Sequence, residues 1–122
     1  MAAAARKPAK APELDLADAA LCLAELGNPA RLAAYRILLA AGFEGLPVNE
    51  VRDQLDIPDS TLTHHLHRLR QAGLITQSRE GRVIRCRVDF QRMDMLMRFM
   101  VSECCRGVTL QGSNTCSSPT CC

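Results

Sequence analysis

The sequence predicts a mainly α-helical fold with one small β-hairpin, in a chain of 122 residues that has room for one domain. Aromatic residues make up only 3% of the chain, so the core must consist of Leu, Ala, Val and Met, which favour helices over a β-sandwich. Apolar residues recur at helical spacing in several segments, and one segment instead combines residues typical of strands with a central glycine.

Two helices are predicted in the first third of the chain. From Leu14 to Leu26 apolar residues recur at helical spacing, and Gly27 ends this helix. Asn28 and Pro29 then fit the N-cap and the first position of a second helix, which continues to about Ala41. A loop is indicated next by Gly42, Gly45 and Pro47.

The middle of the chain predicts a helix-turn-helix. A short third helix is expected over about Val48 to Leu55, and residues 56–60 (DIPDS) form a turn with capping residues. A fourth helix continues to about Ala72, and Gly73 caps it. Its inward face carries leucines at i, i+4 and i+7: Leu62, Leu66 and Leu69.

A β-hairpin and a last helix complete the predicted domain. The strands are expected over 74–79 and 82–88, joined at Glu80 and Gly81. The last helix runs from Asp89 to about Cys105, and we interpret its methionine-rich apolar stripe as a dimer core. A helix-turn-helix followed by a hairpin makes a winged helix-turn-helix. We therefore expect a disordered arm at 1–12, a DNA-binding and dimerisation domain at 13–106, and a flexible Cys-rich tail at 107–122.

The charge distribution points to DNA. The net charge is only +2, but six arginines and one acid, Glu80, lie between Ser60 and Val88. Short polar side chains near the start of the fourth helix suit base edges, and arginines around the hairpin suit phosphates. The expected DNA contacts are Ser60, Thr61, Thr63, His64, Arg68, Arg79, Arg82 and Arg85.

Seven cysteines occur, and we expect thiols in a cytoplasmic protein. The first residues carry charges and prolines but no apolar run of a signal peptide, and no segment is apolar enough to span a membrane. An odd number of cysteines with two adjacent pairs fits a disulfide framework poorly. Cys22 and Cys86 are interpreted as buried small apolar residues.

Three segments resemble the ArsR/SmtB family of metal-responsive bacterial repressors. They are residues 59–75 (DSTLTHHLHRLRQAGLI), residues 26–32 (LGNPARL) and the hairpin tip at residues 79–82 (REGR). The resemblance covers about residues 14 to 105. It implies a homodimer joined by the first and last helices, which binds a palindromic operator and releases it when an effector binds.

The cysteines are the candidate ligands of the effector. The predicted third helix contains no cysteine, and no histidine follows His67, so two metal sites used in the family are absent. Residues 102–107 (SECCRG) resemble the branch of arsenic repressors that holds its metalloid with an adjacent cysteine pair and a third cysteine downstream. The candidate ligands are Cys104, Cys105 and Cys116, with Cys121 or Cys122 as the other possible third ligand. Thiolates prefer soft ions, so the expected effector is As(III), inorganic or methylated, or Sb(III), and no cofactor is expected to be required.

Other interpretations stay open. The same DNA-binding scaffold could serve a thiol redox sensor or a sensor of another soft metal. A small metal carrier without a DNA role is a third possibility. His64, His65 and His67 suggest metal binding only weakly, because they lie on the predicted recognition helix. An enzyme is not expected, because the chain has no CxxC, no phosphate-binding loop and no paired nucleophile and base.

Overall fold

A computed structural model describes residues 13–102, which form five helices and a three-stranded antiparallel sheet. This arrangement confirms the predicted fold class, a mainly helical winged helix-turn-helix. The elements in chain order are α1 (Leu16–Leu26), α2 (Pro29–Ala40), a 3₁₀ turn (Gly42–Glu44), β1 (Leu46–Pro47), α3 (Val48–Leu55), α4 (Asp59–Gln71), β2 (Ile75–Glu80), β3 (Val83–Val88) and α5 (Phe90–Val101).

Three helices begin at side-chain caps. The carboxylate of Asp15 accepts from the backbone N–H of Asp18, so α1 begins at Leu16, two residues later than predicted. Asn28 caps α2 with Pro29 at its first position, as predicted. Asp89 caps α5 in the same way by accepting from the N–H of Arg92. Each cap satisfies a backbone donor that has no partner inside the helix.

The helix-turn-helix consists of α3 and α4. The α3 helix has the predicted bounds and ends at Asp56, which adopts a left-handed conformation with φ of 57°. The expectation of side-chain capping before α4 is wrong: Pro58 occupies the N-cap position and has no side-chain acceptor. The fixed φ of proline directs the chain into the helix instead. The leucine stripe Leu62, Leu66 and Leu69 is fully buried, as predicted.

A third strand corrects the predicted loop after α2. Leu46 pairs with Cys86 and Pro47 with Arg85, so β1 lies on the outer side of β3 in the order β1-β3-β2. Gly45, with φ of 69°, brings the chain against the backbone of β3. A strand of two residues that ends in proline has no alternating pattern, which is why the sequence predicted a loop.

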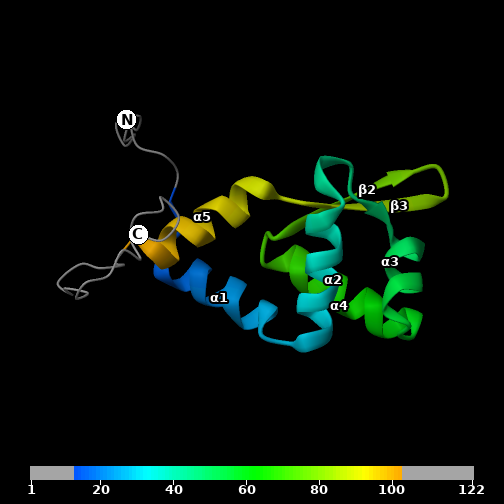
Figure 1. Ribbon diagram of the computed structural model, residues 1–122, viewed down its shortest axis with the longest axis horizontal. Coiled ribbons are helices and arrows are strands. Elements are labelled where there is room, and N and C mark those ends of the chain that lie inside the picture. Colours follow the sequence, from blue (N-terminus) through cyan, green and yellow to red (C-terminus); the bar gives the residue numbers. More distant parts are fainter. Residues whose placement is uncertain (1–12, 103–122) are drawn as a thin grey trace, which may run out of the picture.

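The molecule is elongated, and different elements form its two ends (Figure 1). Helices α1 and α5 contact each other at one end, and the hairpin β2–β3 projects with α3 at the other. The core between them consists of small and aliphatic side chains with Tyr35, and the predicted burial of Cys22 and Cys86 is confirmed. Among residues 13–102, no helix is both long enough and apolar enough for a membrane span. The predicted arm, the Cys-rich tail and the end of the predicted domain lie outside the described residues.

Candidate nucleic-acid interface

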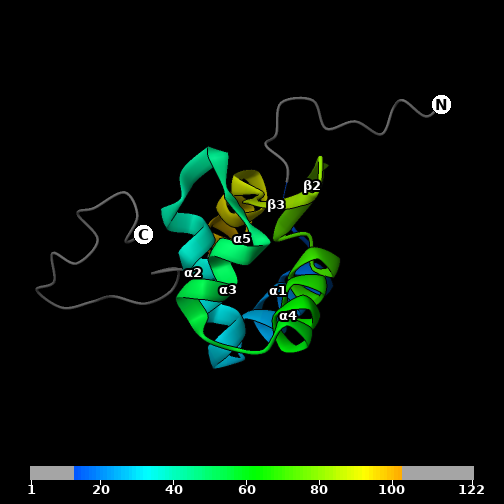
Figure 2. The same ribbon diagram turned by 90° about the vertical axis from the view of Figure 1, so that its right-hand side faces the viewer.

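The first half of α4 presents polar side chains to solvent. Ser60, Thr63 and His64 are exposed, and Thr61 is half-buried. These residues lie off the buried leucine face of α4. Figure 2 views the molecule from the end at which α3 and the hairpin lie. Hydroxyl and imidazole groups near a helix N-terminus suit hydrogen bonds to base edges in a DNA groove. Four of the sequence-predicted contacts therefore lie together on one helix.

An exposed ion pair links the two helices of the motif. Arg52 of α3 donates to the carboxylate of Asp59, at 3.1 Å, in the first turn of α4. Both side chains are largely exposed to solvent, and Asp59 raises the pKa of Arg52. Since exposed pairs contribute little to stability, its main effect is on the position of the start of α4.

The hairpin β2–β3, hereafter the wing, carries the predicted basic residues. Gly81, with φ of 67°, and Arg82 form the two-residue turn between the paired residues Glu80 and Val83. Arg79 and Arg82 are exposed, and neither has an ion-pair partner among residues 13–102. Their charges are therefore available to a polyanion.

The guanidinium of Arg85 is already occupied by partners in this protein. Its guanidinium donates to Glu80 at 3.0 Å and to the backbone carbonyls of Glu44 and Gly45. Arg87 donates to the other oxygen of Glu80 at 3.1 Å, and these two hydrogen bonds lower the pKa of the Glu80 carboxyl. Arg85 thus attaches the wing to the chain before β1 and is less available to phosphates than Arg79 or Arg82.

A groove joins α4 to the wing. It runs between α3, the start of α4 and the first residues of β3, and its lining includes Thr63 and Arg82. Val83 and Ile84, each more than a third exposed, supply an apolar edge. The structure therefore brings a predicted base contact and a predicted phosphate contact to one groove.

Arg68 has a partner that the sequence did not reveal. Its guanidinium donates to both carboxylate oxygens of Glu25 in α1, at 3.1 and 3.0 Å. Glu25 is buried and also accepts from Arg31 at 2.8 Å. The residues are 43 positions apart in sequence, so no local pattern could have indicated this pair.

The candidate metalloid ligands Cys104, Cys105 and Cys116 lie outside the described residues. Within 13–102, no cluster of three or more His, Cys, Asp or Glu side chains could hold a metal ion. The thiols of Cys22 and Cys86 are buried, and burial raises the pKa of both. A buried thiol with a raised pKa is a poor ligand and a poor redox sensor, because the thiolate is the reactive form.

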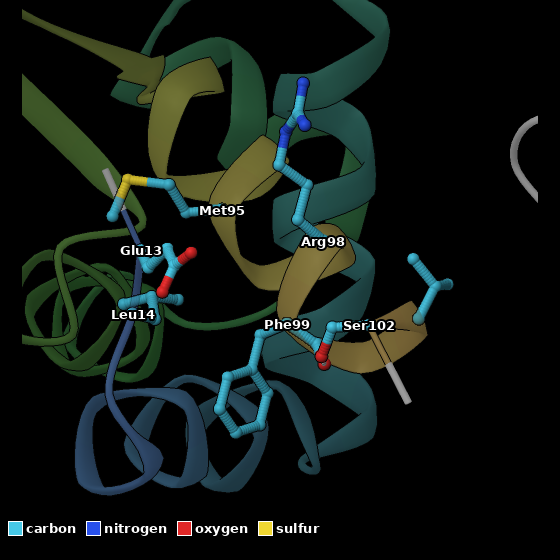
Figure 3. Close-up of a pocket in the computed structure, with 7 residues that line it drawn as sticks. Glu13, Leu14, Met95, Arg98, Phe99 and Ser102 are labelled. Carbon is cyan, nitrogen blue, oxygen red and sulfur yellow. Dashed lines mark hydrogen bonds between the residues drawn. The ribbon is translucent and has the colours of Figure 1, made fainter. Parts of the chain in front are cut away.

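A cavity of about 350 Å³ lies between the end of α5 and the residues before α1 (Figure 3). Leu14, Met95 and Phe99 give it an apolar wall, and Arg98 and Ser102 add polar groups. The thioether of Met95 is the one sulfur atom among its lining residues. A soft ion would therefore need ligands from outside this lining.

Apolar side chains remain exposed on the two helices at this end. Leu16 of α1 is 73% exposed, and Met97 and Met100 of α5 are about half exposed. The rest of the predicted α5 stripe faces inward, with Leu96 buried and Met93 packed against the core. Methionines and leucines exposed at one end of a small domain are typical of a protein–protein interface.

Comparisons with known proteins agree with the fold and the motif. Residues 26–78 match the family model "Helix-turn-helix domain". A protein of Halobacterium salinarum named "Putative arsenical resistance operon repressor ArsR" is 42% identical over 60 residues. That match spans 49% of this chain and 46% of the relative, so it covers less than half of the relative's length.

Two solved structures share the fold. An "ArsR-like Transcriptional Regulator" from Rhodococcus sp. RHA1 has a TM-score of 0.62 and 22% identity, with 70% of this chain and 78% of that chain covered. The homodimeric winged helix-turn-helix DNA-binding domain of Mb0332 from Mycobacterium bovis has a TM-score of 0.57 and 24% identity, with 77% and 92% covered. The chain therefore carries a helix-turn-helix domain on a winged-helix fold, and the comparisons support its resemblance to transcriptional regulators of the ArsR/SmtB family.

Proposed function

We propose that this protein is a homodimeric transcriptional repressor that binds operator DNA and releases it when trivalent arsenic binds its cysteine thiolates. The observation that carries the DNA-binding part is the groove that joins Thr63 of α4 to Arg82 of the wing. In this proposal Ser60, Thr61, Thr63 and His64 contact base edges, and Arg79 and Arg82 contact phosphates.

Dimerisation through α1 and α5 is part of the proposal. It is supported by the exposed apolar side chains Leu16, Leu23, Met97 and Met100, which a second copy would bury. The Mycobacterium bovis domain, which shares the fold, is homodimeric, and this supports a dimer. A two-fold dimer presents two α4 helices, and their separation must match one turn of DNA.

The proposed effector ligands are Cys104, Cys105 and Cys116, with Cys121 or Cys122 as the alternative third ligand. Three thiolates suit As(III), which binds three sulfurs in a trigonal pyramid, and two suffice for a methylated As(III). The name of the Halobacterium salinarum relative supports arsenic as the effector. The buried cysteines Cys22 and Cys86 are poor candidates, as their raised pKa values indicate.

A route from α5 to α4 supports the proposed release. The Arg92 side chain of α5 donates through Nε to the backbone carbonyl of Ala72, at 3.2 Å, where α4 ends. The Cys22 thiol of α1 donates to the same carbonyl at 3.5 Å. A shift of α5 on effector binding would thus change the contact of Arg92 with the end of α4. The separation of the two α4 helices in the dimer would change with it. Effector binding then lowers the affinity for DNA, and DNA binding lowers the affinity for the effector by the same factor.

The test is fluorescence anisotropy of the reduced full-length protein on a labelled duplex from the DNA upstream of its own gene. Arsenite, methylated As(III), zinc and a mild oxidant are added in separate titrations. The proposal expects release by trivalent arsenic. The variant Cys104→Ser, Cys105→Ser should bind DNA with unchanged affinity and ignore arsenite. The variant Cys86→Ser, which changes a buried cysteine of β3 outside the Arg92–Ala72 contact, serves as the matched control and should still respond.

Other outcomes identify the alternatives. Release by the oxidant alone, reversed by a dithiol, would replace the arsenic sensor with a redox sensor on the same scaffold. Release by zinc alone would indicate another metal sensor. Arsenite-dependent release from the double variant would show that the ligand assignment is wrong.

A further inference from the structure

A buried carboxylate connects three helices below the surface proposed to bind DNA. Glu25, at the last turn of α1, is only 4% exposed. It accepts from Arg68 of α4 through both of its oxygens and from Arg31 of α2 through one of them. Arg31 also donates to the backbone carbonyl of Glu25 at 3.1 Å and so caps the end of α1.

The two ends of the Glu25–Arg68 pair have different environments. The Glu25 side chain is 6% exposed, whereas the Arg68 side chain is 44% exposed. Arg68 therefore lies where a polyanion could reach it, and its guanidinium is held by a carboxylate with little exposed surface. The hydrogen bond from Arg68 is the main cause that lowers the pKa of Glu25.

A phosphate competes poorly with the Glu25 carboxylate for Arg68. If Arg68 turned to a phosphate, Glu25 would keep Arg31 but lose its bidentate partner. The exchange gives up two charge-assisted hydrogen bonds inside the protein for one exposed phosphate contact, which is weak and screened by salt. The planar guanidinium also matches the carboxylate through two parallel hydrogen bonds, which a single phosphate oxygen does not reproduce.

We propose that Glu25 is a specificity-determining residue for DNA binding, which holds Arg68 away from the DNA backbone and fixes α4 against α1. This inference rests on the proposed function. Arg79 and Arg82 then carry the phosphate contacts, and the polar side chains of α4 meet the bases without a competing backbone contact from the same helix. Because phosphate contacts are independent of sequence, withholding one favours discrimination between sequences over total affinity.

Removal of the Glu25 charge should release Arg68 to the DNA. Glu25→Gln keeps the size of the side chain but leaves a neutral amide with one acceptor oxygen. Arg68 and Arg31 then lose their shared counter-charge. We expect the dependence of log K on log salt to become steeper by about 0.9 per subunit. Affinity for unrelated DNA rises, and the ratio of operator to random-sequence affinity falls.

The experiment is a salt titration of DNA binding for four full-length proteins: wild type, Glu25→Gln, Arg68→Gln and the double variant. Each is measured by anisotropy on a short random-sequence duplex and on the upstream duplex, with the midpoint of thermal unfolding recorded beside it. The expected slopes are equal for wild type, Arg68→Gln and the double variant, and steeper for Glu25→Gln alone. Arg82→Gln is the control for a true phosphate contact and should lower the slope by about 0.9 per subunit.

Arg68→Gln keeps the test decisive if Glu25→Gln fails to fold, because Glu25 retains Arg31 in that variant. A slope that falls with Arg68→Gln would show that Arg68 contacts phosphate in the wild type and would overturn the inference. An unchanged slope in folded Glu25→Gln would overturn it as well. Wild-type protein that binds neither duplex at any salt concentration would refute the proposed function itself, which separates that failure from the failure of this inference.

Discussion

Gly45 controls the attachment of the wing to the rest of the domain. Its backbone has φ of 69° and ψ of −163°, a region open almost only to glycine. A Cβ at this position would lie 2.0 Å from the carbonyl oxygen of Cys86 and 2.7 Å from Cγ of Arg87. Ordinary contact begins near 3.4 Å, so Gly45→Ala must move β1 away from β3 by more than an ångström.

The expected cost has two parts. Forcing alanine into this backbone region costs roughly 1–3 kcal/mol. Separation of the strands also weakens the Leu46–Cys86 pairing and the hydrogen bonds from Arg85 to the Glu44 and Gly45 carbonyls, at about 1 kcal/mol for each bond lost. Together these give a loss of about 3–5 kcal/mol in the free energy of unfolding.

Denaturant and thermal unfolding followed by circular dichroism test this estimate. Gly81→Ala is the matched control, because Gly81 also has positive φ, of 67°, but a Cβ added there would meet no atom within 4 Å beyond its chain neighbours. It should lose only about 1–2 kcal/mol, the cost of a left-handed alanine. For a domain of this size, each kcal/mol corresponds to roughly 4–8 °C in Tm. Equal losses for the two variants would show that contact with β3 does not determine the need for glycine at position 45.

Two further predictions concern pH and assembly. Burial, together with the charge of Arg31, lowers the pKa of His65 from 6.5, and its Nδ1 accepts from Nε of Arg31. His65 therefore binds a proton more readily in the unfolded chain than in the folded protein. The free energy of unfolding should fall as pH decreases from about 6.5 to the lowered pKa of folded His65. Urea titrations should show this fall in the wild type and a shallower one in His65→Gln. Met97→Glu should convert the dimer to monomer in sedimentation velocity, because Met97 is 48% exposed on the proposed interface. Phe43→Gln, at an apolar residue that is 82% exposed but lies outside α1 and α5, should stay dimeric, and a dimeric Met97→Glu protein would rule out this interface.

Local signals in the sequence were sufficient for most of the fold. Asn28 and Pro29 predicted the start of α2, and the leucine stripe predicted the buried face of α4, because caps and helical spacing act over a few residues. The hairpin was also predicted, with its turn one residue too early: the sequence placed the turn at Glu80 and Gly81, whereas Glu80 pairs with Val83 and the turn is Gly81 and Arg82.

Contacts between residues far apart in the sequence were not predicted. The strand β1 exists because Leu46 meets Cys86, and a strand of two residues carries no periodic signal. Arg68 was expected on DNA because its neighbours are polar and basic, but its partner, Glu25, lies on another helix. The same physical reason covers both cases, since a contact between distant residues depends on tertiary packing that no local pattern encodes.

Whether α4 and the wing bind DNA through the exposed arginines is tested most directly by the salt dependence of binding. Wild type, the double variant Arg79→Gln, Arg82→Gln, and the control Arg98→Gln are titrated with salt on the upstream duplex. Arg98 is exposed and paired with Asp94 on α5, at the other end of the molecule (Figure 1). We expect the double variant to lose about 1.8 in slope per subunit while the control keeps the wild-type slope. Equal slopes for all three proteins would contradict this mode of DNA binding.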